Sequence, residues 1–244
     1  MASRPIAVFD SGLGGISVLR HLLRLLPNED YLYFGDNKNA PYGTKSREQV
    51  QTLTLAAAEH LLSFHPKALV IACNTATSAA IGLLREKYPD EIIIGIEPAL
   101  KPAIEANPDG VIGVMATPLT LKEEKFQRLS AQYPGMQVVS VPAPGLVERI
   151  EAGEDPDKME AFLKDLLAQY PKMDAIVLGC THYPFVGELL AKITGATVLD
   201  GGEGTARHTA RRLIDAGLAG GGTGKVTWQF SAGDGQSSRA KELL

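Results

Sequence analysis

The chain has 244 residues, of which 45% are hydrophobic and 21% are charged. This composition supplies enough apolar material for a sizeable core and excludes a predominantly disordered chain. Lys and Arg total 24 against 28 Asp and Glu, which gives a formal net charge of -4 and lacks the basic excess typical of nucleic-acid binders. The length fits one large domain or two small ones.

The N-terminal sequence MASRPIAVFDSG has no apolar stretch of signal-peptide length. No apolar run approaches the roughly 18 residues of a membrane span. We therefore expect a cytoplasmic protein without membrane partners, in a compartment where thiols stay reduced.

Short apolar runs alternate with helical patterns along the first part of the chain. The run at 5–9 predicts a buried strand, and the spacing of Ile16, Leu19, Leu23 and Leu26 predicts a helix over 14–26. The same reasoning predicts strands at 31–34, 68–72 and 91–96, and helices at 46–64 and 77–87. Ser46 is a plausible N-cap for the longer of these helices.

The same rhythm repeats in the second part of the chain. It predicts strands at 110–115, 137–141, 175–178 and 197–199, and helices at 119–132, 158–170, 185–193 and 203–216. After a glycine-rich stretch at 217–224 we expect a last strand at 225–231 and a short helix at 237–244. Alternating strands and helices predict an α/β fold with parallel sheets covered on both faces.

Two successive runs of this kind predict two α/β lobes. We expect the first crossover near residues 96–100, and the segment after about Asp200 to return to the first lobe. The expected first lobe therefore comprises 1–96 plus 207–244, and the second comprises 97–206.

Polar residues follow several predicted strands at the edge where ligands bind in open parallel sheets. They are Asp10-Ser11, Asp36, Cys73-Asn74-Thr75, Thr117 and Cys180-Thr181-His182. Each set also has a structural interpretation: Asp10 is equally suited to an Asx-turn or a helix N-cap, and His182 to a polar turn. Gly12-x-Gly14-Gly15 lacks the third glycine of a dinucleotide-binding loop, which indicates a tight turn into a helix.

Cys73 and Cys180 are the two cysteines of the chain, 107 positions apart. They could form a disulfide, be buried small hydrophobes, or be reactive thiols that meet in the fold. Both end a predicted buried strand just before a predicted helix, where the helix N-terminus lowers a thiol pKa and binds anions. The matching contexts favour reactive thiols, one per lobe.

The motifs Asp10–Gly15, Pro41-Tyr42-Gly43, Ala72–Thr75 and Gly179–Pro184 resemble those of bacterial glutamate racemases, in the aspartate/glutamate racemase superfamily. They occur in family order and span nearly the whole chain. The resemblance implies two pseudo-symmetric α/β lobes with the active site in the cleft between them. It also implies cofactor-independent racemisation of L- and D-glutamate that supplies D-glutamate for peptidoglycan, and a homodimer.

The resemblance implies that Cys73 removes the Cα proton of D-glutamate and Cys180 that of L-glutamate. Inversion at carbon needs a base on one face and an acid on the other, which two like residues on two lobes supply. Asp10 and His182 would assist the two thiols, and Glu151 matches the acidic residue of the family better than Glu148.

The remaining implied roles concern substrate binding. Tyr42 and Gly43 of the Pro41-Tyr42-Gly43 motif would offer backbone N–H groups to the side-chain carboxylate. The residues that would bind the ammonium or the α-carboxylate, or lie near the ligand on the second lobe, are Ser11, Asn74, Thr75, Thr181, Thr117 and Thr120.

Three departures from the family pattern and three alternatives remain. The departures are Asn37 after Gly35-Asp36, Ala116 before Thr117, and the segment 142–146, where Ala143-Pro144-Gly145-Leu146 replaces the common Cys-Pro-Leu-Phe. The alternatives are a racemase for aspartate or another amino acid, a cysteine hydrolase built on Cys180 and His182, and a non-catalytic two-lobed binding protein. No metal site is expected.

Overall fold

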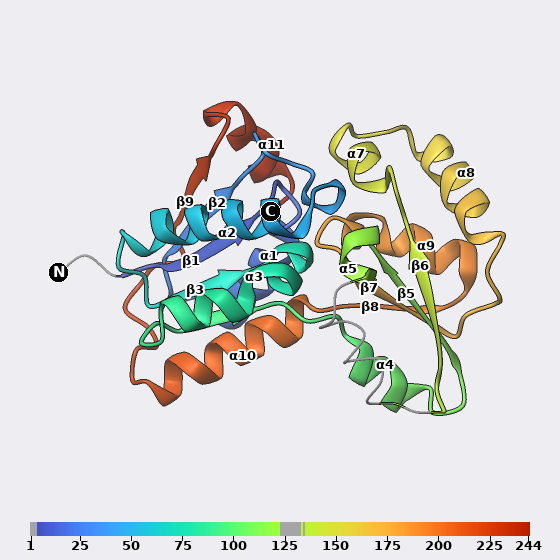
Figure 1. Ribbon diagram of the computed structural model, residues 1–244, viewed down its shortest axis with the longest axis horizontal. Coiled ribbons are helices and arrows are strands. Elements are labelled where there is room, and N and C mark those ends of the chain that lie inside the picture. Colours follow the sequence, from blue (N-terminus) through green and yellow to red (C-terminus); the bar gives the residue numbers. More distant parts are fainter. Residues whose placement is uncertain (1–3, 123–132, 134) are drawn as a thin grey trace.

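The structure is a computed structural model that describes residues 4–122, 133 and 135–244. Its strands form two parallel sheets, and helices cover both faces of each sheet (Figure 1). The α/β fold with two lobes expected from the sequence is therefore confirmed.

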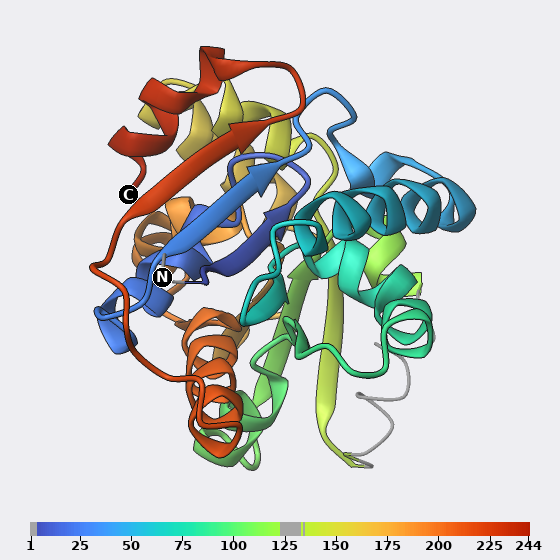
Figure 2. The same ribbon diagram turned by 90° about the vertical axis from the view of Figure 1, so that its left-hand side faces the viewer.

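The first sheet has five parallel strands in the order β4-β3-β1-β2-β9. Their bounds are Ile6–Asp10 (β1), Tyr31–Gly35 (β2), Ala68–Ile71 (β3), Ile93–Gly95 (β4) and Val226–Phe230 (β9). Figure 2 shows the red β9 beside the blue β2, so the C-terminal part of the chain returns to the sheet in which the chain begins.

Two hydrophobic clusters cover the faces of the first sheet. One lies under α1, α10 and α11, with bounds Ile16–Leu25, Gly202–Asp215 and Ser237–Glu242. The other lies under α2 and α3, with bounds Arg47–Leu62 and Asn74–Lys87. Fully buried Leu19 and Leu22 anchor α1, each contributing about 1.5–3 kcal/mol by leaving water. This anchoring holds the start of α1 against the end of β1.

The second sheet has four parallel strands in the order β6-β5-β7-β8. Their bounds are Val111–Ala116 (β5), Gln137–Pro142 (β6), Ala175–Gly179 (β7) and Thr197–Asp200 (β8). One face packs under α7, α8 and α9, with bounds Leu146–Glu151, Pro156–Leu167 and Gly187–Thr194, and the other under α4 and α5, with bounds Leu100–Ala106 and Pro118–Lys122. Short 3-10 turns cover Tyr42–Thr44, Tyr183–Val186 and Asp234–Gln236.

Local sequence signals explain several helix starts. Ser46 begins α2 with a capping box, in which its hydroxyl accepts from the Gln49 N–H and Gln49 Oε1 accepts from the Ser46 N–H. Asp155 caps α8, and Pro156 occupies its first turn. Ser46 was expected as an N-cap and α2 begins where predicted, whereas α8 begins at Pro156, two residues before its predicted start.

All nine predicted strands are present within a few residues of their expected bounds. The predictions missed α4 and α7, which are too short for a periodic apolar pattern. Helix α3 begins at Asn74 rather than 77, because the Cys73 side chain caps it by accepting from the Ala76 N–H. Helix α5 covers the start of the helix predicted at 119–132, and residues 123–132 lie outside the described part of the chain.

A buried ion pair fastens the glycine-rich segment that leads into β9. Lys67 Nζ lies 2.6 Å from Glu29 Oε2 and also donates to the Gly220 carbonyl, while the Gly220 N–H donates to the Glu29 carboxylate. Both side chains are almost fully buried. Each charge therefore depends on the other to offset its desolvation.

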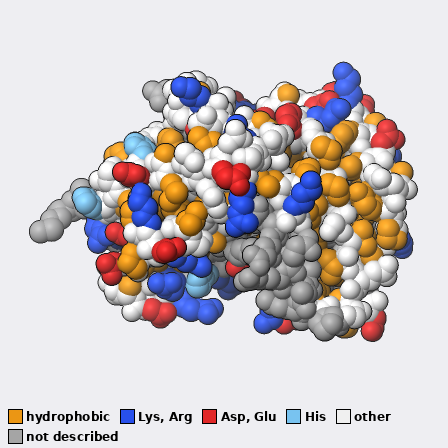
Figure 3. Space-filling model, in the orientation of Figure 1, with side chains coloured by type: hydrophobic (Ala, Val, Ile, Leu, Met, Phe, Trp, Pro, Cys, Tyr) orange, Lys and Arg blue, Asp and Glu red, His pale blue; other side chains and the backbone are white. Residues whose placement is uncertain are grey.

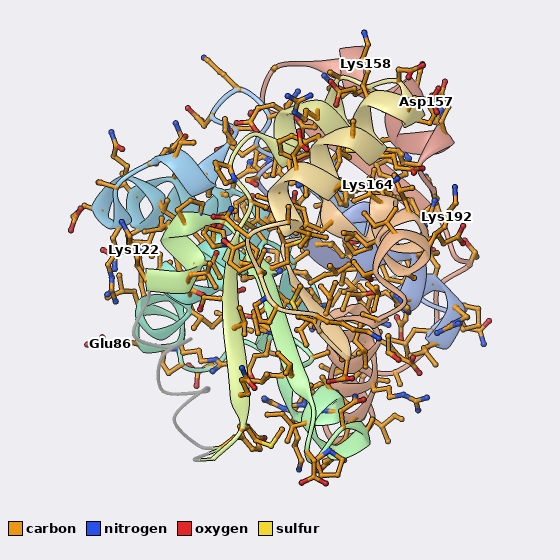
Figure 4. All side chains as sticks on the ribbon, turned by 90° about the vertical axis from the view of Figure 1, so that its right-hand side faces the viewer. Glu86, Lys122, Asp157, Lys158, Lys164 and Lys192 are labelled. Carbon is orange, nitrogen blue, oxygen red and sulfur yellow. The ribbon has the colours of Figure 1, made fainter. Side chains whose placement is uncertain are left out.

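The surface carries both signs of charge. On the face shown in Figure 3, acidic and basic side chains alternate over the first lobe. Figure 4 shows Lys164 and Lys192 on neighbouring helices α8 and α9, and both pair with Glu160, at 2.7 and 3.5 Å. In the described segments, no helix is long and apolar enough to cross a bilayer.

Candidate active site

A cavity of about 240 Å³ lies between the lobes, where β1, β3 and β7 end. This volume lies just below the roughly 300–1,000 Å³ of sites for drug-sized ligands, which fits a smaller molecule. Eleven of the residues expected at the site line it: Ser11, Pro41, Tyr42, Gly43, Cys73, Asn74, Thr75, Thr117, Cys180, Thr181 and His182. Asp10 and Thr120 are buried behind this lining, and Glu151 lines a neighbouring pocket that it shares with His182.

Both cysteines line the cavity as free, buried thiols, one from each lobe. The possibility of a disulfide between them is therefore excluded. The Cys73 thiol donates to Ser11 Oγ at 3.6 Å and accepts from the Ala76 N–H at 3.4 Å. Burial and the nearby Asp10 carboxylate raise the pKa of Cys73 to about 12. The sequence-based expectation of a lowered pKa is wrong here, because burial outweighs the helix N-terminus.

Cys180 has different surroundings. A 3-10 turn rather than an α-helix follows it, and the nearest ionisable partner is His182, whose Nδ1 lies 3.9 Å from Cys180 Sγ. On its other side, His182 Nε2 lies 2.8 Å from Glu151 Oε1. Cys180 is therefore the first member of a Cys180–His182–Glu151 series of contacts, and the described residues form no such series beside Cys73.

The contacts of His182 with Cys180 and Glu151 determine the charge of its imidazole. Burial alone would lower the pKa of His182, but its contacts with Cys180 and Glu151 raise it to about 10. Burial would likewise raise the pKa of Glu151, and the contact with His182 lowers it below its ordinary value. At neutral pH the pair is therefore an imidazolium beside a carboxylate, and the imidazolium lies next to Cys180.

Asp10 connects the lobes at the back of the cavity. Its Oδ1 accepts from the Thr181 hydroxyl at 3.0 Å, and its Oδ2 accepts from the Gly12 N–H at 2.9 Å. The glycines after Asp10 allow the second lobe to come close: a Cβ on Gly14 would lie 2.4 Å from His182 Nδ1, and one on Gly12 would lie 2.7 Å from Glu151 Oε1. These glycines therefore allow the two lobes to come into contact, and this role, rather than dinucleotide binding, accounts for them.

The side-chain amide of Asn74 is buried at the cavity wall and has no hydrogen-bond partner among the described residues. Its side chain is 3% exposed, and neither its Oδ1 nor its Nδ2 has a partner. Buried amide groups normally have partners, so this side chain points to a polar ligand.

Three threonine hydroxyls meet across the lobe boundary. Thr75 Oγ1 lies 3.2 Å from Thr117 Oγ1 and 3.1 Å from Thr120 Oγ1, and the last two are 2.9 Å apart. Thr75 and Thr117 line the cavity, whereas Thr120 is behind them. Thr120 is thus placed to orient the other two hydroxyls.

The loop that carries Pro41, Tyr42 and Gly43 is held from beneath by Asp36. The Tyr42 hydroxyl donates to Asp36 Oδ2 at 2.6 Å, and its buried ring packs against Phe9. The Ala40–Pro41 peptide bond is cis. Burial and the Asp36 carboxylate raise the pKa of Tyr42 far above its ordinary value, so the hydroxyl stays a donor.

Part of the cavity wall was not expected from the sequence: Thr44, Pro118, Ala143, Pro144, Gly145, Val147 and Tyr183. Ala143–Gly145 follow β6, so the strand-end reasoning applied to β6 would have found them. Glu148 and Glu151 are one helical turn apart on α7: Glu148 reaches the cavity, whereas Glu151 meets His182.

One thiol from each of two α/β lobes, at a single cavity with an imidazolium–carboxylate pair, defines an acid–base site built on cysteine. The sequence profile of the Asp/Glu/hydantoin racemase family matches residues 6–209, and the chain belongs to this family. The resemblance to glutamate racemases is confirmed as well. The glutamate racemase of Clostridium novyi (strain NT) is 54% identical over 216 residues, which are 86% of this chain and 83% of the relative.

Solved structures agree with this placement. Glutamate racemase from Francisella tularensis subsp. tularensis SCHU S4, in complex with D-glutamate, is 30% identical with a TM-score of 0.87, covering 99% of this chain and 94% of that one. Escherichia coli glutamate racemase, in complex with L-glutamate and the activator UDP-MurNAc-ala, is 35% identical with a TM-score of 0.79, covering 86% and 83%.

Proposed function

We propose that this chain is a glutamate racemase that interconverts L- and D-glutamate with two protein thiols and no cofactor. The observation that carries the proposal is the pair of buried free thiols, one per lobe, at one cavity. Relatives at about half sequence identity have this name, and related structures hold either enantiomer of glutamate. The product D-glutamate would serve peptidoglycan synthesis.

The proposed reaction transfers one proton at each thiol. With L-glutamate, the Cys180 thiolate takes the Cα proton, and the Cys73 thiol gives a proton to the opposite face. The products are D-glutamate, a Cys180 thiol and a Cys73 thiolate, and the reverse reaction exchanges the roles. The raised pKa of Cys73 supports its role as the acid, and Cys180, which lies beside the His182 imidazolium, takes the role of the base.

We assign substrate contacts from the cavity wall. Asn74, with its unpartnered amide, binds the α-carboxylate or ammonium together with Ser11, Thr75 and Thr181. Backbone N–H groups of Tyr42 and Gly43 bind the side-chain carboxylate. Thr117 contacts the substrate from the second lobe, and Thr120 orients the Thr117 hydroxyl. Asp10 lies behind the substrate ammonium. Glu151 acts through His182.

We further propose a cytoplasmic homodimer that binds neither nucleic acid nor membrane. The lobes comprise about 1–96 plus 207–244 and 97–206. Ala206 belongs to the hydrophobic cluster of the first lobe, so the return crossing is better placed at the start of α10, near Gly201.

The direct test follows the circular dichroism of purified protein with L-glutamate, which should decay to zero without added cofactor. The same assay with aspartate separates this proposal from an aspartate racemase. Cys73→Ser should lose racemisation but still exchange the Cα hydrogen of L-glutamate in deuterated water, and Cys180→Ser should do so with D-glutamate only. Full racemisation by either variant would contradict the two-thiol mechanism.

A further inference from the structure

Ser17 is a first-lobe residue that reaches the catalytic turn of the second lobe. It lies in the first turn of α1 and is 7% exposed. Its Oγ lies 2.8 Å from the Gly14 carbonyl oxygen and 2.9 Å from the Thr181 carbonyl oxygen. The first contact is within the helix start, whereas the second crosses from one lobe to the other.

The contact with Thr181 matters because of where that carbonyl lies. It belongs to the peptide that joins Thr181 to His182, directly after Cys180. The hydroxyl of the same threonine donates to Asp10 Oδ1. Thr181 is therefore held by the first lobe at both its side chain and its backbone, and the two contacts together restrict rotation of the turn.

Other residues at the start of α1 support the same side of the site. Gly14 approaches His182 so closely that a Cβ would lie 2.4 Å from Nδ1. The Leu13 backbone contributes to the lowered pKa of Glu151 through a hydrogen bond, and Arg20 lies over the Phe185 ring at 5.7 Å. This segment contacts the Cys180–His182–Glu151 series, whereas Cys73 has its own contacts with Ser11 and Ala76.

We propose that Ser17 is a positioning residue for the Cys180 half of the reaction: its hydroxyl holds the Thr181 carbonyl and thereby aims the Cys180–His182 turn at the substrate. The inference rests on the proposed racemase function. A hydroxyl has one proton to donate, so the bond to Thr181 competes with the one to Gly14. A residue that only stabilised the start of α1 would need only the hydrogen bond to the Gly14 carbonyl. The experiment separates this structural role from the positioning of Cys180.

The test compares Ser17→Ala with the wild type by primary isotope effects on α-deuterated L- and D-glutamate. If Ser17 positions Cys180, its loss raises the barrier for proton transfer at Cys180 and lowers kcat roughly tenfold, the worth of one hydrogen bond. The isotope effect should then grow with L-glutamate and shrink with D-glutamate. A loss of folded protein lowers kcat but leaves both isotope effects unchanged.

A second readout does not depend on racemisation. Alkylation by iodoacetamide, followed for each cysteine by mass spectrometry, should become several-fold faster at Cys180 in Ser17→Ala and stay unchanged at Cys73. Ser17→Thr keeps the hydroxyl and should restore wild-type values in both readouts. Ser63→Ala removes a hydroxyl that donates to its own helix, to the His60 carbonyl, and should change neither.

If Ser17→Ala does not fold, Ser17→Cys, which keeps the volume but donates weakly, should show the same changes to a smaller degree. The proposal is overturned if the folded variant has the isotope effects and Cys180 alkylation rate of the wild type, or if both thiols change alike. Failure of the wild type to racemise glutamate would refute the proposed function, whereas the alkylation readout would still decide the role of Ser17.

Discussion

Replacing Glu151 by glutamine tests the electrostatic role of the imidazolium. The substitution keeps the shape of the side chain and removes the charge that lies 2.8 Å from His182 Nε2. A hydrogen bond between charged groups contributes about 1.5–3 kcal/mol, which corresponds to about one to two pKa units. Glu151 is 32% exposed, whereas His182 is buried, so water screens part of this energy and the lower end, about one unit, applies.

The direction of the change follows from the pKa of His182. In the folded chain it is raised from 6.5 to about 10, so protonated His182 stabilises the fold fully below about pH 6.5, and this stabilisation is lost as pH rises through about 10. The same deprotonation removes the positive charge of the ring whose Nδ1 lies 3.9 Å from Cys180 Sγ, the atom that takes the Cα proton of L-glutamate in the proposed reaction. We therefore expect kcat for L-glutamate to fall on the basic side, near pH 10 for the wild type and about one unit lower for Glu151→Gln.

The measurement is the pH dependence of kcat by circular dichroism. It uses kcat because that parameter reports groups in the substrate complex rather than the ammonium of free glutamate. Glu148→Gln, the same substitution one turn earlier on α7, should leave the position of the basic limb unchanged. A basic limb at the same pH in Glu151→Gln and the wild type would refute the role assigned to the pair.

Two further changes probe the lobe contact and the fold. Gly14→Ala should lower kcat/KM at least tenfold with an unchanged far-ultraviolet spectrum, because the new Cβ would displace His182; wild-type kinetics would contradict the close approach of the lobes. Lys67→Met should lower the free energy of unfolding by about 3–5 kcal/mol in urea denaturation, since it leaves Glu29 buried and unpaired. The double variant with Glu29→Leu should recover most of that loss, and no recovery would show that the charge pair is not the cause.

Much of the site could be predicted because parallel strands place their carboxyl ends at one edge. Cys73 and Cys180 were found as strand-terminal residues, and Glu151, which the resemblance preferred to Glu148, lies beside His182. The strands were found because buried parallel strands are short, continuous apolar runs.

What the sequence could not supply depends on packing in three dimensions. The pKa of Cys73 depends on complete burial beside Asp10, which outweighs a helix N-terminus that is visible in the sequence. Thr120 was expected at the ligand but lies behind Thr117, a difference of one helical turn. The contact of Ser17 with Thr181 joins residues 164 positions apart, and no local pattern marks such a pair.

The unlike surroundings of the two thiols have a thermodynamic consequence. Enantiomers in water have equal free energies, so the equilibrium constant of the proposed reaction is one, and kcat/KM must be equal in the two directions however different the two halves of the site are. The imidazolium beside Cys180 and the neutral, buried Cys73 can therefore bias only how tightly each enantiomer is held and how fast it turns over once bound. Any enantiomer that this asymmetric site binds more tightly must be converted more slowly, in the same proportion.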